Sequence, residues 1–438
     1  MMPAPLAALL AGTVRPGHAV VAWRDGEALT WDRLRGEVGA LAARLGGERV
    51  ALRSEDGYAF CVGLLAAAVA GCPVLLLPPG APALIENLAP HWDRLLGDGG
   101  EPILTGEAAA PPAGFDPARA TVTFLTSGST GQPKRFGRSL ARLEAEVAAV
   151  AAFAGPLGPG CHRATVPHHH AYGLIFKLLW PLLAGRPFAA RSYPLWEPLL
   201  AELHDGDVLV SGPAHLARLD GLASARRPDL ILSAGAPLPT AAASAAARLF
   251  GRAVSEILGS TETGAIAHRP GGGTMSWLPL PGAEIDHDRD GLMLMTAPWL
   301  DGQARGADRI VPALAGGFHL LGRADRVVKI EGARVGLAGV EAALAALPEI
   351  DEAAVVVLPE GGTTLAAAVV LSEPGQRRLA DDGAFRLGRA LRNRLAERLE
   401  PAARPRRWRF VPSLPVNALG KRTNAAVMAL FPSESADA

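Results

Sequence analysis

The chain has few cysteines and no excess of charge of either sign. Its 438 residues include three cysteines, Cys61, Cys72 and Cys161, which form neither a disulfide framework nor the spacing of a metal site. We expect them to be small buried hydrophobic residues of a protein from a reducing cytoplasm. Lysine and arginine together number 43, as do aspartate and glutamate, so the net charge gives no argument for binding nucleic acid or a membrane surface.

The sequence also lacks segments typical of export or membrane insertion. Its first ten residues contain no basic side chain, which argues against a secretory signal. Residues 59–85 form an uncharged run long enough for a membrane span, but Gly71–Pro73 interrupts it. We predict a buried helix up to about Ala70 and a buried strand over Pro73–Leu77, and hence a soluble cytoplasmic protein without a membrane span.

Length and pattern predict an α/β protein of more than one domain. The chain exceeds what one hydrophobic core usually supports. Thr30 suits the N-cap of a helix over 31–45, and Val50–Leu52 has strand character. Further buried strands are predicted at Asp207–Ser211 and Leu230–Ser233. Such alternation favours a parallel sheet covered by helices.

The most informative stretch runs from Thr123 to Lys134 and reads TFLTSGSTGQPK. A short apolar strand leads into a turn of hydroxyl residues and glycines, whose N–H and O–H groups can converge on phosphate oxygens, and Lys134 adds a positive charge. The spacing excludes a Walker A motif, because Gln132 and Pro133 separate the second glycine from the lysine. A Ser/Gly-rich surface turn is the alternative interpretation.

Two groups of potential metal ligands do not predict a metal site. The three adjacent histidines over 168–170 point in different directions on a strand or loop and have no carboxylate or cysteine nearby. We expect His168 and His169 to be ordinary polar loop residues. The alternating aspartates over 286–290 lack the other ligands of a calcium loop, so we expect a hairpin turn there.

Several motifs resemble those of the adenylate-forming superfamily of acyl-CoA synthetases, luciferases and peptide-synthetase adenylation domains, in the order in which that superfamily has them. The resemblance covers about residues 30–430. The motifs that carry it are the loop at 123–134, PHHHAYGL at 167–174, AGAPL at 234–238, EILGSTETG at 256–264, GAD at 306–308, GRADRVVKIEGARV at 322–335 and LPVNALGK at 414–421.

The resemblance implies an α/β fold with two domains. Residues 1–323 would form a large N-terminal domain of helix-covered sheets that binds the nucleotide and the acid, and residues 324–438 a small mobile C-terminal α+β lid domain. Asp325 would be the hinge between them. Gly332 would lie in the loop that lines the pantetheine tunnel after the small domain has moved.

The resemblance also implies which residues bind ATP and Mg²⁺. Thr261 would contact the α-phosphate and Glu262 would hold Mg²⁺, an ion that prefers hard oxygen ligands. Lys421 would reach the substrate carboxylate and the α-phosphate, where negative charge develops during adenylation. The other nucleotide-binding residues would be Thr126, Ser127, Gly128, Ser129, Thr130, Gly131 and Lys134 of the loop, Gly235, Ala236 and Pro237 of the adenine-binding turn, and the ribose contacts Asp308 and Arg323.

The acyl pocket would be bordered by His170 and Gly259. Leu258 stands where the family usually has an aromatic residue, and Gly306 stands where it usually has threonine.

The function implied by the resemblance is ATP-dependent activation of a small carboxylic acid to acyl-AMP with release of pyrophosphate, followed by transfer of the acyl group to a phosphopantetheine thiol. The contexts of 167–174 and 407–411 resemble, more narrowly, stand-alone ligases of bacterial aryl polyene and xanthomonadin-type pigment clusters, which load a hydroxybenzoate-like acid on an acyl carrier protein. A free-standing CoA ligase for an aryl or short fatty acid is the alternative. A non-catalytic nucleotide-binding regulator is an alternative of another class.

A local excess of arginine lies near the C-terminal end. Eleven arginines but four acidic residues occur from Arg377 to Arg409. Solvated helix faces are one interpretation of this excess. The other is a docking surface for an acidic carrier protein or for the phosphates of CoA.

Overall fold

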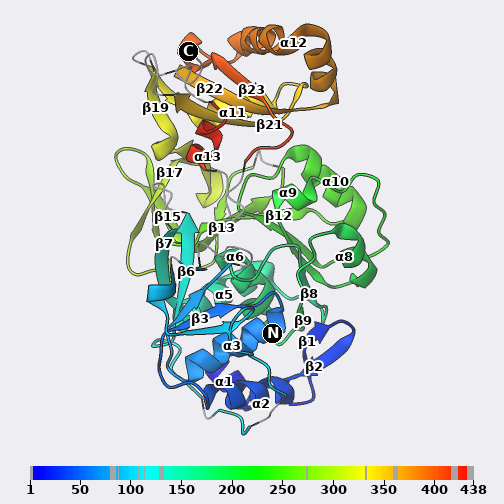
Figure 1. The fold of residues 1–438 in the computed structure, drawn as a ribbon, viewed down its shortest axis with the longest axis vertical. Coiled ribbons are helices and arrows are strands. Elements are labelled where there is room, and N and C mark those ends of the chain that lie inside the picture. Colours follow the sequence, from blue (N-terminus) through cyan, green and yellow to red (C-terminus); the bar gives the residue numbers. More distant parts are fainter. Residues whose placement is uncertain are drawn as a thin grey trace.

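Two large sheets covered by helices make up most of the chain in the computed structural model, and smaller sheets follow them (Figure 1). The structure describes residues 3–78, 85–86, 88–106, 109–112, 114–127, 133–272, 275–330, 333–358, 364–415 and 423–431.

The larger sheet has nine strands among the described residues, in the order β14-β13-β12-β11-β10-β8-β9-β1-β2. Its central strands, from β12 to β9 and on to β1, are parallel neighbours. The strands are β1 (Val20–Arg24), β2 (Glu27–Thr30), β8 (His162–Ala164), β9 (Phe188–Ala189), β10 (Val208–Ser211), β11 (Leu230–Ala234), β12 (Val254–Ser260), β13 (Gly264–Pro270) and β14 (Leu278–Pro279).

The second sheet has five strands in the order β5-β3-β4-β6-β7 within the described ranges. All neighbours are parallel except β6 and β7, which form an antiparallel hairpin. The strands are β3 (Val50–Arg53), β4 (Val74–Leu76), β5 (Arg94–Gly97), β6 (Thr121–Ser127) and β7 (Pro133–Ser139).

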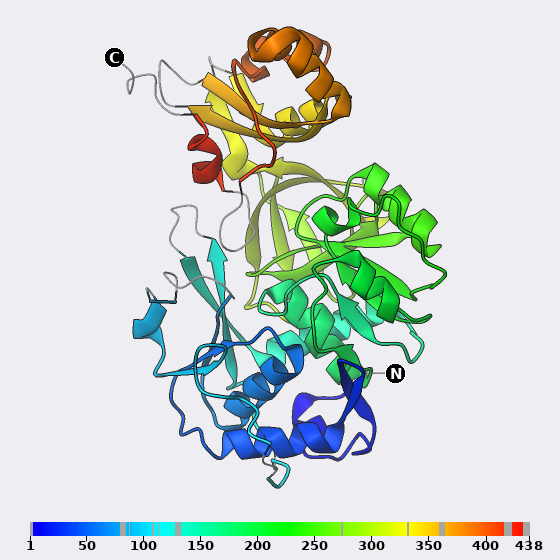
Figure 2. The ribbon, with the colours of Figure 1, turned by 45° about the vertical axis from the view of Figure 1, so that its right-hand side comes forward.

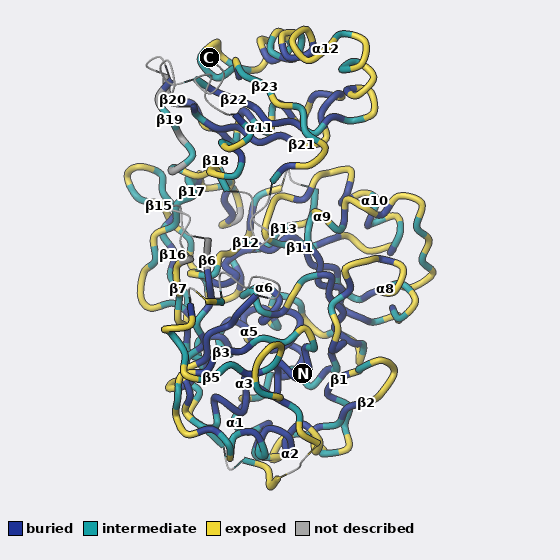
Figure 3. Tube along the Cα trace, in the orientation of Figure 1, coloured by how far each residue is buried: buried dark blue, intermediate teal, exposed yellow. Residues whose placement is uncertain are grey.

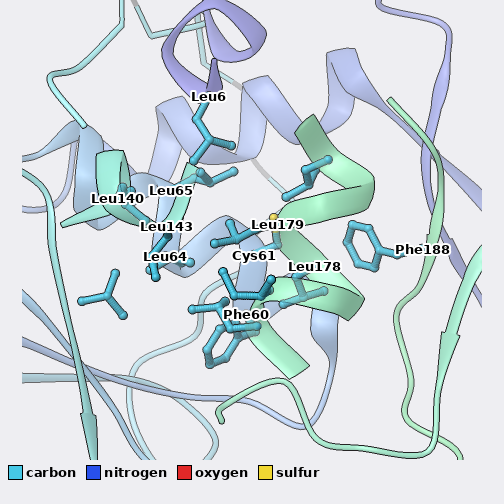
Figure 4. Packing of buried hydrophobic residues seen from close by; sticks show 14 of the residues in the cluster. Leu6, Phe60, Cys61, Leu64, Leu65, Leu140, Leu143, Leu178, Leu179 and Phe188 are labelled. Carbon is cyan, nitrogen blue, oxygen red and sulfur yellow. The ribbon is translucent and has the colours of Figure 1, made fainter. Parts of the chain in front are cut away.

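Helices pack between and around these two sheets, and the buried parts of the chain are dark blue in Figure 3. Most of the apolar side chains form one large core, whereas those of α8, α9 and α10 form a second cluster. Figure 4 shows Phe60 and Leu64 of α3 close to Leu178 and Leu179, with Leu140 and Leu143 of α5 beside them. The helical elements of this part are α1 (Leu6–Leu10), α2 (Trp31–Ala42), α3 (Gly57–Val69), η1 (Ala89–His91), α5 (Leu140–Ala154), α6 (Ala171–Gly173), the π-helical turn η2 (Leu174–Leu179), α7 (Trp180–Ala184), α8 (Trp196–Glu202), α9 (Pro213–Leu216) and α10 (Thr240–Phe250).

Helix α3 is buried on nearly every side, as expected for a helix that is apolar all round. Gly63 lets it approach β3, because a Cβ atom at this position would lie 2.6 Å from Leu52 Cδ1. The predicted change from helix to strand near Gly71 is confirmed by α3 and β4. None of the helices in the described ranges combines the length and apolar character needed to cross a bilayer.

The other local predictions are also confirmed. The hydroxyl oxygen of Thr30 caps α2 by accepting the N–H of Arg33. The strands expected near 50, 207 and 230 are β3, β10 and β11. All three cysteines are buried. The hairpin turn predicted at 286–290 joins β15 and β16, with Asp288 and Asp290 in the turn and Asp286 in β15.

A third sheet leads from the large sheets to the C-terminal part of the chain. It has the order β15-β16-β17-β18 in the part that the structure describes, with each neighbouring pair antiparallel. Its strands and the short turns beside them are β15 (Glu284–His287), β16 (Leu292–Thr296), β17 (Ala304–Pro312), η3 (Leu314–Gly316), β18 (Phe318–Arg323) and η4 (Ala324–Arg326).

The residues after η4 form a smaller body at one end of the long axis (Figure 2). Its apolar clusters contain no described residue before Val328, so its core is separate from those of the large sheets. The elements are β19 (Val327–Ile330), β20 (Ala333–Gly336), α11 (Leu337–Ala345), β21 (Ile350–Leu358), β22 (Thr364–Leu371), α12 (Glu373–Arg394), η5 (Leu395–Glu397), η6 (Pro401–Ala403), β23 (Arg407–Phe410) and α13 (Asn424–Met428).

A buried carboxylate joins the two large sheets. Glu146 of α5 places Oε2 2.7 Å from Nη2 of Arg138 on β7, and both side chains are only 3% exposed. Its Oε1 accepts the N–H of Ala265 at the start of β13, at 2.7 Å. One side chain therefore contacts the five-stranded and the nine-stranded sheet at once.

We predict that Glu146→Ala lowers the free energy of unfolding by about 3–5 kcal/mol, because it leaves the buried Arg138 without its counter-ion. The measurement is the urea midpoint of the first unfolding transition. Arg377→Ala is the control, since it removes an exposed i,i+4 pair with Glu373. Equal midpoints for the two variants would contradict the prediction.

Candidate active site

Four parallel strands of the nine-stranded sheet end at one edge. β8, β10, β11 and β12 are successive neighbours in this sheet. The segments that follow them emerge side by side, and ligands of open α/β sheets bind at the carboxyl ends of such strands. These segments carry the histidines at 168–170, the turn Gly235–Pro237, and Thr261 with Glu262. Parallel register therefore gathers three of the predicted site segments.

The turn between β12 and β13 is held by its own hydroxyl groups. The N–H of Ser260 donates to Thr263 Oγ1, and the N–H of Thr263 donates to Ser260 Oγ, both at 3.1 Å. Trp299 Nε1 donates to the carbonyl oxygen of Thr263 at 3.0 Å. The turn is therefore fixed without the side chains of Thr261 and Glu262, which lie between its ends.

Glu262 has an exposed carboxylate that forms no ion pair within the described ranges, and the Thr261 hydroxyl is its neighbour. A carboxylate and a hydroxyl on a fixed turn are hard oxygen donors, which suit Mg²⁺. The residues present therefore fit the expected ion. Gly259 lies on the exposed part of β12, where a Cβ atom would overlap the carbonyl oxygen of Gly264. Only glycine allows the two strands to approach this closely.

The turn after β11 presents exposed backbone. Gly235 has a φ of +93°, a conformation that favours glycine, and Ala236 and Pro237 are exposed. The turn is fastened from below by Glu256 of β12, whose Oε1 accepts the N–H of Leu238 at 2.9 Å. The other oxygen of Glu256 accepts from Arg269 Nε at 2.9 Å. Sequence analysis missed Glu256, although a carboxylate inside an apolar strand is a signal for a buried partner.

The hairpin β6–β7 brings Thr126 opposite Lys134 and Ser127 opposite Pro133. Only the backbone of Thr126 and Ser127 is described. Lys134 is exposed and forms no ion pair with the described residues. Its ammonium group is therefore available to an anion. The loop residues between the strands, Gly128, Ser129, Thr130 and Gly131, lie outside the described residues.

Asp308 and Arg323 face each other across β17 and β18. The antiparallel register of these consecutive strands thus brings together the two residues predicted to contact ribose. Asp325 follows in η4, between the four-stranded sheet and the smaller body. Gly332 and Lys421 lie outside the described residues.

The expectation that His168 is an ordinary polar loop residue was wrong. Its side chain is buried, and its ring centroid lies 4.6 Å from that of Phe60. His169 and His170 are half-buried, with ring centroids 4.2 Å apart. Burial lowers the pKa of His169 to about 3, because the charged imidazolium is desolvated, and the nearby His170 acts in the same direction.

Lys177, in η2, is another residue that sequence analysis missed. It is the one charged residue from Leu174 to Ala184, and its ammonium group lies against His168. An isolated lysine in an apolar run was the available signal.

Comparisons with known proteins show which family the chain is similar to. Residues 86–287 match the family described as AMP-binding enzyme, and residues 339–421 match the AMP-binding enzyme C-terminal domain. The chain is 32% identical to 4-coumarate–CoA ligase of Rhodobacter capsulatus over 69% of this chain and 74% of that protein. It is 30% identical to anthranilate–CoA ligase of Pseudomonas aeruginosa over 79% of this chain and 75% of that protein.

Solved structures of the same fold are similar over almost the whole chain. The benzoate CoA ligase from Burkholderia xenovorans LB400 superposes with a TM-score of 0.78 at 23% identity, covering 95% of this chain and 98% of that chain. ATP-bound MatB from Rhodopseudomonas palustris gives 0.78 at 22% identity, with 98% of both chains covered. These matches confirm the predicted α/β fold, with a large N-terminal domain and a smaller C-terminal domain.

We predict that the histidines at this edge make the fold sensitive to acid. His169 stays neutral in the folded chain down to about pH 3, whereas in the unfolded chain it takes up a proton near its ordinary value of 6.5. Unfolding therefore binds a proton between these values, so stability falls as pH falls from 6.5 towards 3. His169→Gln should flatten the pH dependence of the thermal midpoint in this window and leave it unchanged between pH 7 and 8. An unchanged slope in the acid window would contradict the prediction.

Proposed function

The chain belongs to the AMP-binding enzymes of the adenylate-forming superfamily, and we propose that it activates an aromatic carboxylic acid with ATP and transfers the acyl group to a phosphopantetheine thiol. The observation that carries this proposal is the gathering of the histidine segment, the Gly235–Pro237 turn and the Thr261–Glu262 turn at one sheet edge. Support for an aromatic acid comes from the relatives, whose names specify 4-coumarate, anthranilate and benzoate.

The first half-reaction needs ATP because a carboxylate is a poor acyl donor. A carboxylate oxygen of the acid attacks the α-phosphorus of ATP, and pyrophosphate leaves. In this proposal the Thr261 hydroxyl contacts the α-phosphate, and the Glu262 carboxylate would hold Mg²⁺, which would supply positive charge to the phosphate oxygens. The Gly235–Pro237 turn binds adenine through its backbone, and Asp308 and Arg323 bind the ribose.

In the second half-reaction the thiol attacks the carbonyl carbon of the acyl-adenylate, and AMP leaves with the electron pair of the broken bond. We propose that residues 324–438 rotate about Asp325 between the two steps, so that the segment with Gly332 replaces Lys421 at the site. The separate apolar cores on either side of η4 support a domain boundary at Arg323. His170 and Gly259 border the acyl pocket in this proposal.

We predict that Lys421→Ala abolishes formation of the adenylate and spares transfer from adenylate supplied chemically, because the lysine serves only the first conformation. ATP–pyrophosphate exchange measures the first step, and thioester formation from synthetic acyl-adenylate measures the second. Glu262→Gln should weaken use of Mg²⁺·ATP in the same first step, and Glu373→Gln, on the distant helix α12, is the control. If Lys421→Ala lost both half-reactions, the prediction that the lysine serves only the first would be wrong.

The exchange assay with a panel of aromatic and aliphatic acids at equal concentration tests the function itself. We expect hydroxybenzoate-like acids to support the fastest exchange, in keeping with the narrower resemblance to ligases of aryl polyene clusters. Exchange with none of the acids would refute the proposed enzyme and favour a nucleotide-binding regulator.

Helix α12 provides an argument about which molecule carries the thiol that accepts the acyl group. Arg386, Arg389 and Arg392 recur at helical spacing on one face and form no ion pair among the described residues. By contrast, Arg394 lies 2.5 Å from Glu349, which also pairs with Arg378 at 3.0 Å. Some of the arginines in this region are therefore neutralised by ion pairs. Among the described residues, Arg386, Arg389 and Arg392 are not, and we call these three residues the basic face.

The basic face also contains an apolar side chain. Phe385 is 83% exposed and adjoins Arg386, while the opposite side of α12 packs Gly388 against Trp408. Basic residues around an exposed aromatic ring suit an acidic protein better than they suit phosphate groups alone. We therefore propose an acyl carrier protein as the acceptor. Free CoA is the second candidate, because the relatives named above are CoA ligases.

We predict that reversing the basic face, as Arg386→Glu, Arg389→Glu and Arg392→Glu, raises the apparent KM for holo acyl carrier protein. The effect should shrink as salt screens the field, and pyrophosphate exchange should be unaffected. A charge-matched control reverses Arg119, Arg226 and Arg289, three exposed arginines that lie before β18 and outside the smaller body. Turnover with CoA, none with carrier proteins and indifference to the reversal would favour the CoA ligase.

A further inference from the structure

Lys177 is fully buried and forms no salt bridge with the carboxylates of the described residues, although the charge of Asp56 is near enough to offset part of the lowering of its pKa by burial. Its Nζ atom has three hydrogen-bond partners among the described residues, which are Ser192 Oγ at 2.9 Å, His168 Nδ1 at 3.2 Å and the carbonyl oxygen of Ala190 at 3.3 Å. Burying an ammonium group without a counter-ion is costly. Burial accordingly lowers the pKa of Lys177 to about 7. Apolar packing alone would not require a charged residue here.

The carbonyl oxygen of Ser54 determines the tautomer of His168. It lies 2.8 Å from Nε2 and can only accept, so the ring proton is on Nε2. In a neutral imidazole Nδ1 then carries the lone pair, and it accepts a hydrogen bond from Lys177 Nζ at 3.2 Å. Both ring nitrogens are used, and the imidazole is neutral, in agreement with the lowered pKa that burial causes.

These contacts hold residues 166–168, which precede His169 and His170, from two sides. Ser192 Oγ, a partner of Lys177, donates to the carbonyl oxygen of Val166 at 3.2 Å. Lys177 thus holds Val166 through Ser192 and holds His168 directly. Ser54 follows β3 of the five-stranded sheet, and Ser192 follows β9 of the nine-stranded sheet, so the segment is anchored to both sheets.

The close approach of these groups depends on glycine. A Cβ atom at Gly57 would lie 2.6 Å from the carbonyl oxygen of Ala190 and 3.3 Å from Lys177 Nζ. The N–H of Gly57 donates to the same carbonyl oxygen at 2.7 Å. Ala190 therefore keeps a donor without the lysine, whereas His168 Nδ1 has no other partner among the described residues.

We propose that Lys177, acting through the Nε2–H tautomer of His168, holds the segment 166–170 in the position in which His169 and His170 face the bound acid. Lys177 is a positioning residue for the acid, because it lies beneath the segment and does not touch the reacting atoms. This role rests on the proposed function, since it concerns the acid pocket. A lysine that only stabilises the fold is the competing explanation.

The two explanations differ in what Lys177→Met changes. The methionine removes the buried charge and keeps a side chain of similar length, so the thermal midpoint should not fall. The segment loses its hydrogen-bonded anchor, so the KM for the acid in pyrophosphate exchange should rise about tenfold, as expected from the loss of a hydrogen bond to a charged group. The KM for ATP should not change. Lys177→Gln should restore part of the acid affinity, because its amide can donate to His168.

The tautomer gives a readout that does not depend on activity. In the full-length protein with ¹⁵N-labelled histidine, His168 should show a proton on Nε2 and a bare Nδ1, and Lys177→Met should shift the Nδ1 resonance, because that nitrogen loses its hydrogen-bond donor. His168→Gln provides a double-mutant cycle, in which Lys177→Met should have little further effect on the KM for the acid.

Three outcomes would overturn the proposal. One is an unchanged KM for the acid in a folded Lys177→Met protein. Another is a lower thermal midpoint together with similar increases in the KM for the acid and the KM for ATP, which is the result expected of a purely structural lysine. The third is a proton on Nδ1 of His168. Absence of exchange with every acid in the unaltered protein would refute the proposed function and with it the role in acid binding, while the Nδ1 resonance of His168 would still show whether Lys177 donates to it.

Discussion

The loops proposed to bind the nucleotide are carried by two different sheets, and the buried carboxylate of Glu146 fixes how those sheets lie against each other. Its oxygens face Arg138 on β7 and the N–H of Ala265 on β13. β7 belongs to the hairpin whose strands are joined by residues 128–132, and Ala265 follows the turn with Thr261 and Glu262. Apolar packing tolerates small shifts, whereas a charged contact with defined geometry does not. The distance between the two loops therefore depends on this side chain.

The same arrangement recurs beneath the other site segments. Glu256 holds the Gly235–Pro237 turn through the N–H of Leu238, and the pair of His168 and Lys177 holds the segment before His169. In each case a buried polar side chain supports the segment from within the domain. Binding geometry on strand-end loops needs such support, because the loops have no sheet hydrogen bonds of their own.

Local features were predictable from the sequence, and long-range partners were not. The Thr30 cap, the helix-to-strand change near Gly71 and the hairpin at 286–290 depend on residues close together in the chain, so propensity and turn chemistry suffice for them. Lys177 and Glu256 have partners supplied by other elements, and the partner of Glu146 at Ala265 is 119 residues away. The sequence marks these side chains as isolated charges in apolar surroundings but does not say what they contact. Asp308 and Arg323 were assigned by resemblance, and their strand register then placed them opposite each other.

The buried glutamates differ from ordinary buried ion pairs in one respect. A buried pair can often be replaced by apolar side chains at little cost, because both desolvated charges disappear together. Glu146 and Glu256 each also accept a backbone N–H, from Ala265 and Leu238 respectively. Replacing Glu146 and Arg138 by leucines would leave the buried N–H of Ala265 without a partner, and a backbone donor cannot be removed by substitution at another residue. These carboxylates are thus required by the backbone at the ends of the strands, and the arginines beside them are the consequence, since a buried carboxylate needs a counter-ion.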